Sequence, residues 1–211
     1  MANKQSTDWY TYRSIILVLI ETISIYLFSC NNPFSIREGE PPIHSQLIWS
    51  PPTEPGIVIE NLQSALANSN LSYYIRCLGG DFIFLADENE RSTINPDAWK
   101  YQNWNFDIEQ SAMTRLFNFF RDTIRADNPV IDVNFSRTSQ ADVILPGDSA
   151  RLYRDYEIKI YHNYPQYPSY CRGTLLWTMK ADPSGFWTIT HWSDLKIDSL
   201  DWGAFKGIFR F

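Results

Sequence analysis

The spacing of apolar residues changes along the chain from a helical to a strand pattern. Three segments carry apolar residues three or four positions apart, which predicts helices. The third is expected over about 107–121, with Asn105 as its N-cap. The second is expected to end at Gly79–Gly80. The apolar stripes of the first two comprise Val58, Leu62, Ala65 and Leu66, then Leu71, Tyr74, Ile75 and Leu78.

Five other segments have the pattern of strands. Residues 81–85 form a short, continuous apolar run, which favours a strand buried on both faces. Strict alternation over 130–136 and 152–162 predicts two strands with one polar face each. Segments 171–180 and 186–192 flank the turn sequence Asp-Pro-Ser-Gly and should form a hairpin. The order of elements indicates an α+β fold, in which a curved, mostly antiparallel sheet wraps over three helices.

The chain before this domain has a different character. An apolar run ends at Leu27-Phe28-Ser29-Cys30, which resembles the processing site of a bacterial lipoprotein, although Glu21 and the bulky Phe28 depart from the usual pattern. The run is shorter than a membrane span. We expect residues 1–29 to be a signal peptide and Cys30 to carry the lipid. An uncleaved signal anchor is the alternative, and both place the domain outside the cytoplasm.

Proline is frequent in residues 30–55, which lack any helix or strand period, so an extended linker is expected there. One domain would then occupy residues 56–211, with an aromatic C-terminal tail that docks on it. Asn31 after the cysteine is similar to lipoproteins that are sent to the outer membrane, where the organism has one.

Composition narrows the choice of partners. The net charge of −6 argues against nucleic acid, whose binding needs clustered Lys and Arg. Aromatic residues make up 16% of the chain, which indicates a large core or an aromatic-lined pocket. Cys77 and Cys171 could pair in an oxidising compartment, or each could be a small buried side chain. The spacing of Cys and His predicts no metal site.

The order of elements, the strand DFIFLAD, Trp104 before the third helix and the closing hairpin resemble the nuclear transport factor 2-like superfamily. The hairpin carries the pattern Gly185-x-Trp187-x-Ile189-x-x-Trp192-x-Asp194. The likeness covers about residues 53–195 and is greatest to extracytoplasmic lipoproteins of unassigned role. The resemblance implies a cystatin-like cone whose sheet wraps a cavity. It does not select a chemistry, because such folds include isomerases, dehydratases and non-catalytic binding modules.

Few residues are candidates for chemistry. His191 could act as a general base if Asp81 or Asp194 oriented it, although a structural histidine is the simpler interpretation. Asp132 could be a strand-borne acid with Asn134 beside it, or both could lie on a solvated face. Arg154 and Arg172 could converge on an anion, or pair with carboxylates across strands. Three tryptophans could wall a pocket or fill the core, namely Trp177, Trp187 and Trp192.

The sequence contains no phosphate-cradling glycine loop, nucleophile elbow or paired-histidine zinc helix. We therefore expect an envelope domain that binds a small apolar ligand or a protein partner without catalysis, and without a cofactor or metal. Two alternatives stay open. One is an acid-base enzyme of the isomerase or dehydratase kind with its site in the cone. The other is a structural module that forms a homodimer through the outer face of the sheet.

Overall fold

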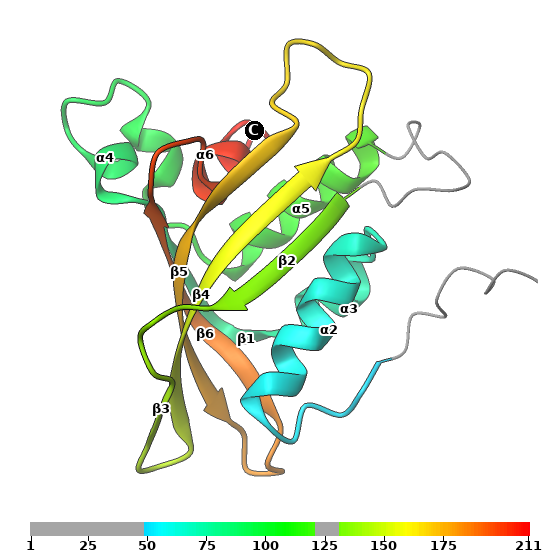
Figure 1. Cartoon of the computed structure of the whole chain (residues 1–211), viewed down its shortest axis with the longest axis vertical. Coiled ribbons are helices and arrows are strands. Elements are labelled where there is room, and N and C mark those ends of the chain that lie inside the picture. The colour runs from blue at the N-terminus through cyan, green and yellow to red at the C-terminus, as the bar shows by residue number, and fades with distance from the viewer. Residues whose placement is uncertain (1–48, 121–130) are drawn as a thin grey trace, which may run out of the picture. The chain divides into compact units, whose positions relative to one another are not determined.

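The computed structural model describes residues 49–120 and 131–211, which lie within one compact unit, Leu47–Phe211 (Figure 1). Cys30, the expected signal peptide and most of the expected linker fall outside the described residues. The last linker residues contact the folded domain. The side-chain amide of Asn61 exchanges two hydrogen bonds with the backbone of Ser50, and the Trp187 amide donates to the Pro52 carbonyl at 2.7 Å.

The sheet has the order β1-β6-β5-β4-β2, with β3 paired to β4. β1 runs parallel to β6, and the other pairs are antiparallel. The strands are β1 (Leu78–Leu85), β2 (Ile131–Arg137), β3 (Val143–Leu145), β4 (Ser149–Ile160), β5 (Tyr170–Ala181) and β6 (Trp187–Lys196). The predicted α+β class with a curved, mostly antiparallel sheet is confirmed.

Helices cover one face of this sheet (Figure 1). α2 (Pro55–Ala67) and α3 (Leu71–Arg76) form the predicted helical hairpin, and α5 (Phe106–Phe120) is the predicted third helix. The Asn105 side chain accepts from the Ile108 amide, so the predicted N-cap is confirmed. The polar connection before α5 also contains a short helix, α4 (Glu88–Arg91), and a 3-10 helix, η1 (Ala98–Tyr101).

Two predictions for the segment around β1 are wrong. The second helix ends at Arg76, and Gly79–Gly80 belong to β1, because the Cys77 carbonyl accepts from the Ile189 amide and so directs the chain into the sheet. Residues 81–85 are not buried on both faces, since Ile83 is 42% and Leu85 37% exposed. β1 lies at the sheet edge, and the helices cover only the face that carries Phe82 and Phe84.

The aromatic tail folds into α6 (Trp202–Gly207) and docks as predicted. Trp202 and Phe205 are fully buried, and their rings stack with centroids 5.6 Å apart. Glycines allow the close approach: a Cβ on Gly203 would lie 3.1 Å from Phe84, and one on Gly207 would lie 2.9 Å from Tyr101. The tail therefore fills the space that α5 and the sheet leave open.

Candidate functional site

The face of the sheet away from the helices is left uncovered by the described residues. We call it the open face. Apolar side chains gather on it at the β1 and β6 side, where Ile83, Leu85 and Leu195 are 42%, 37% and 47% exposed. Register places His191 opposite Ile83 and Ser193 opposite Leu85. The open face thus combines an apolar part on β1 and β6 with polar residues on β2, β4 and β5, and an apolar centre with a polar rim is typical of protein interfaces.

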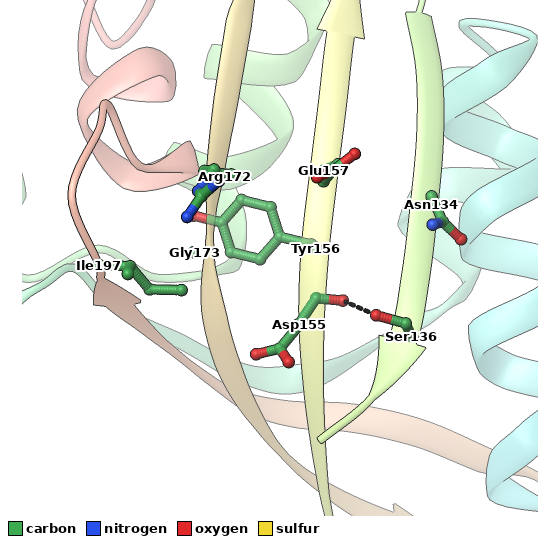
Figure 2. A pocket seen from close by; sticks show the side chains of 8 residues that line it. All are labelled: Asn134, Ser136, Asp155, Tyr156, Glu157, Arg172, Gly173 and Ile197. Carbon is green, nitrogen blue, oxygen red and sulfur yellow. Dashed lines mark hydrogen bonds between the residues drawn. The ribbon is translucent and has the colours of Figure 1, made fainter. Parts of the chain in front are cut away.

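A polar hollow of about 340 Å³ lies at the rim of the open face (Figure 2). Its charged groups are Asp155, Glu157 and Arg172, and Glu157 faces Arg172 across the β4–β5 register. The Arg172 guanidinium pairs with Asp198 at 3.0 Å, and this neighbouring carboxylate raises the pKa of Arg172. Asp155 accepts from the Thr174 hydroxyl at 2.7 Å. The remaining lining residues are Asn134, Ser136, Tyr156, Gly173 and Ile197.

The interior contains a buried ion pair that was not predicted from the sequence. The Glu109 carboxylate of α5 accepts from the Lys206 ammonium of α6, and both side chains are fully buried. It also accepts from the Tyr74 hydroxyl and from the Trp104 indole N–H, the latter at 2.6 Å. Burial lowers the pKa of Lys206, and the Glu109 carboxylate opposes that shift. Every polar atom of this pair is therefore occupied by a protein group.

A second buried group fixes the start of α6. The Asp194 carboxylate accepts from the Tyr156 hydroxyl at 2.8 Å and from the Gly203 amide at 2.6 Å. The Tyr156 hydroxyl in turn accepts from the Trp202 amide, and Asp201 caps the Ala204 amide. Burial raises the pKa of Asp194 to about 7. A carboxyl with such a pKa is a candidate acid or base, but Asp194 is only 1% exposed and binds the tail.

The expected catalytic residues do not form one site. Asp194 points into the core, whereas His191, three residues earlier on β6, lies on the open face, because side chains alternate along a strand. Its Nδ1 lies 3.2 Å from the Thr190 hydroxyl. Asp81 pairs with Lys180 at 3.7 Å on the surface. Asp132 is exposed on β2 opposite Lys159, so the solvated-face interpretation fits it.

The two candidate arginines lie on opposite faces of the sheet. Arg154 is buried, and its guanidinium donates to both Asp142 oxygens at 2.6 and 2.8 Å, which lowers the pKa of that carboxyl. Arg172 lies on the open face. They cannot bind one anion together, because each already pairs with a carboxylate on its own side.

The candidate aromatic walls belong to the core. Trp177 and Trp192 are fully buried, with ring centroids 5.3 Å apart in an edge-to-face pair, and Trp187 packs against the same core. Cys77 and Cys171 are both free, buried thiols, so the structure lacks the bridge considered from the sequence. Burial raises the pKa of Cys77 to about 12, which makes it a poor nucleophile.

The Tyr-Pro segment after β4 packs on the domain. The rings of Tyr164 and Tyr167 lie 4.9 and 4.7 Å from Phe119 at the end of α5, and Tyr167 stacks on Phe209 of the tail. This loop is therefore fixed by α5 and the C-terminal residues.

Within residues 49–120 and 131–211 there is no cluster of three or more His, Cys, Asp or Glu that could hold a metal ion. The helices in these same ranges are too short or too polar to cross a membrane.

No protein-family model matches the chain, and no curated protein does either. Solved structures are similar in fold. A nuclear transport factor 2-like protein of unknown function from Shewanella oneidensis has 10% identity and a TM-score of 0.42, over 66% of this chain and 93% of that one. A nuclear transport factor 2-like protein from Cytophaga hutchinsonii has 13% identity and a TM-score of 0.43, over 66% of this chain and 93% of that one. A protein of unknown function with a cystatin-like fold from Nostoc punctiforme has 9% identity and a TM-score of 0.42, over 68% of this chain and 88% of that one. These likenesses concern the fold alone.

Proposed function

We propose that this protein is a lipid-anchored, non-catalytic envelope domain that docks a protein partner on its open face. The observation that carries the proposal is the exposure of Ile83, Leu85 and Leu195 together on one face of the sheet. Apolar side chains that share an exposed sheet face mark interaction sites in soluble domains. The anchor is proposed from the sequence around Cys30.

The filled interior supports binding at the surface. α6 occupies the inside of the curved sheet, and the acidic and basic groups there bind one another or the backbone of the tail. A substrate would have to displace Trp202 and Phe205 before it reached Asp194. An enzyme needs a titratable group that its substrate can touch. The open face requires no such rearrangement.

A second copy of the chain is the second candidate partner. The open face carries both signs of charge, with Arg151 and Glu157 on β4 and Arg172 on β5. A two-fold dimer brings each patch against its own copy, so a face with both signs can complement itself.

Crosslinking in intact envelopes tests the proposal. Leu85→Asp and Leu195→Asp place a charge on the open face, whereas Ile94→Asp places one on a 91% exposed side chain outside the sheet. We expect a crosslinked adduct of the wild-type chain that both open-face variants lose and Ile94→Asp keeps. An adduct of twice the chain mass identifies a homodimer, and another mass identifies a different protein. An adduct that survives both open-face changes overturns the proposal.

A further inference from the structure

A second hollow, of about 330 Å³, lies where the chain enters the domain, and we call it the entry hollow. It is built from three parts of the chain: the segment before α2, the end of α3 and the start of β6. Its lining is apolar apart from one guanidinium and one hydroxyl. The lining residues are Trp49, Pro51, Pro52, Arg76, Phe186 and Thr188.

The walls of the entry hollow are held in place by hydrogen bonds to the backbone. Asn61 fixes Ser50 to α2, with distances of 3.1 and 2.7 Å, and the Pro52 carbonyl accepts from the Trp187 amide. Two prolines between these points restrict the backbone further. The hollow is thus preformed, which lowers the entropic cost of binding.

The cation in the entry hollow lacks a carboxylate among the described residues. The Arg76 guanidinium lies over the Trp49 ring, 4.1 Å from its centroid, and 5.6 Å from that of Tyr73. Arg154 and Arg172, in contrast, are both in ion pairs. When a guanidinium lies over an indole ring, the ring covers one face of the guanidinium. The N–H groups, which point outward in the plane of the guanidinium, can then still donate to an oxyanion such as phosphate.

The position of the entry hollow favours one source for that phosphate. Trp49 follows the expected lipid attachment site, Cys30, along the chain, and even a fully extended connection would reach only about 65 Å. The hollow is therefore the part of the described domain that lies nearest in sequence to the expected lipid attachment site. Trp is enriched at membrane interfaces, and Phe is among the apolar residues that interfacial segments bury in the bilayer; Phe186 is 41% exposed here.

We propose that the entry hollow binds the headgroup of a bilayer phospholipid. The phosphate lies against the Arg76 guanidinium, and the apolar part of the lipid contacts Trp49 and Phe186. This inference rests on the proposed function in one respect, because it needs the domain to be tethered to a membrane. The open face plays no part in it.

Photo-crosslinking of the full chain in its membrane tests the inference. A benzophenone amino acid replaces Phe186, which keeps a phenyl ring in the hollow. A second chain carries it at Ile94, which follows α4 in the chain and does not line the hollow. Mass spectrometry identifies the molecule attached at each site. We expect a phospholipid adduct at position 186 and little or none at 94. Adducts only with protein at position 186, or equal lipid adducts at both positions, overturn the inference.

Arginine variants test the role of the charge. Arg76→Gln should lower the lipid adduct at position 186 severalfold, whereas Arg137→Gln, an exposed change on β2, should leave it unchanged. An adduct that is insensitive to Arg76→Gln overturns the phosphate assignment. Fractionation of the wild-type and Cys30→Ser chains separates the two proposals. A wild-type chain that is not membrane-bound, or a Cys30→Ser chain that still is, refutes the anchor. A membrane-bound wild-type chain without a lipid adduct at 186 refutes only the headgroup site.

Discussion

Lys206 donates to both carboxylate oxygens of Glu109, each at 2.9 Å, in a part of the molecule from which solvent is excluded. The two residues join α6 to α5 although they are 97 positions apart in the sequence. Three aromatic rings surround the ammonium group, with centroids 3.5 Å away for Phe84, 4.9 Å for Trp192 and 5.3 Å for Trp104. The C-terminal helix is therefore held by a charge pair as well as by its apolar side chains.

Lys206→Met should destabilise the domain by about 3–5 kcal/mol, because it leaves the Glu109 carboxylate buried without its counter-charge. Urea unfolding followed by tryptophan fluorescence measures the loss. Lys180→Met is the matched control, since Lys180 is 55% exposed and its 3.7 Å pair with Asp81 contributes little. The double variant Glu109→Gln/Lys206→Met should recover part of the loss, as neither charge is then buried. Equal effects of the two lysine changes would contradict this account.

Gly173→Ala should cost about 1–3 kcal/mol, because the new Cβ would lie 2.6 Å from the Tyr156 hydroxyl and 2.8 Å from the Leu195 carbonyl. The hydroxyl cannot move without loss of its bonds to Asp194 and Trp202. Gly80→Ala, on β1, is the control, since its Cβ would meet nothing within 4 Å. A thermal melt compares the two variants, and a neutral Gly173→Ala would show that Tyr156 does not depend on this close approach.

The sequence predicted the elements whose apolar spacing is regular. The α5 stripe and the alternation in β2 and β4 each follow from one buried face, so their type and order are correct. The prediction that β1 is buried on both faces is wrong because a run of apolar residues does not indicate how many faces of the strand are covered. Its exposed side became visible only from its place at the sheet edge. β3, with three residues, is too short for any period to show.

The interior charges were missed for a related reason. Glu109 lies at the head of the buried α5 stripe, one turn before Ala112 and Met113, and a charge in that position was the available signal. Its partner could not be predicted from the sequence, because Lys206 lies far along the chain in the aromatic C-terminal segment. A lysine in such a segment is expected to be exposed to solvent. Pairing of this kind depends on how α6 folds back, which local sequence does not encode.

Cys77 and Cys171 should resist alkylation in the native protein. Burial raises the pKa of both thiols, to about 12 for Cys77, so almost no thiolate is present at pH 8. In a Cys30→Ser background, iodoacetamide should add nothing to the folded chain and two groups in urea, as mass spectrometry would show. A urea-unfolded chain that takes up label only after reduction would reveal a disulfide and contradict the structure.

The stability of the domain should depend on pH through Asp194. Its pKa is raised to about 7 in the folded state by burial, against about 4 in an unfolded chain. The folded state therefore binds the proton more tightly, and its contribution to stability is complete below about pH 4 and is lost as the pH rises towards 7. The slope is at most about 1.4 kcal/mol per pH unit in this window.

Asp194→Asn removes the titration and keeps an acceptor oxygen for the Gly203 amide. Urea midpoints at pH 5, 6, 7 and 8 should fall more steeply for the wild type than for Asp194→Asn up to about pH 7, and the two curves should then run parallel. Asp142, whose pKa is lowered, titrates in both proteins and cancels in the difference, whereas the charge of Asp201 helps to raise the pKa of Asp194 and is part of the effect that the comparison measures. Parallel curves from pH 5 onward would mean that Asp194 is already ionised at pH 5, held as a carboxylate by Tyr156 and the Gly203 amide.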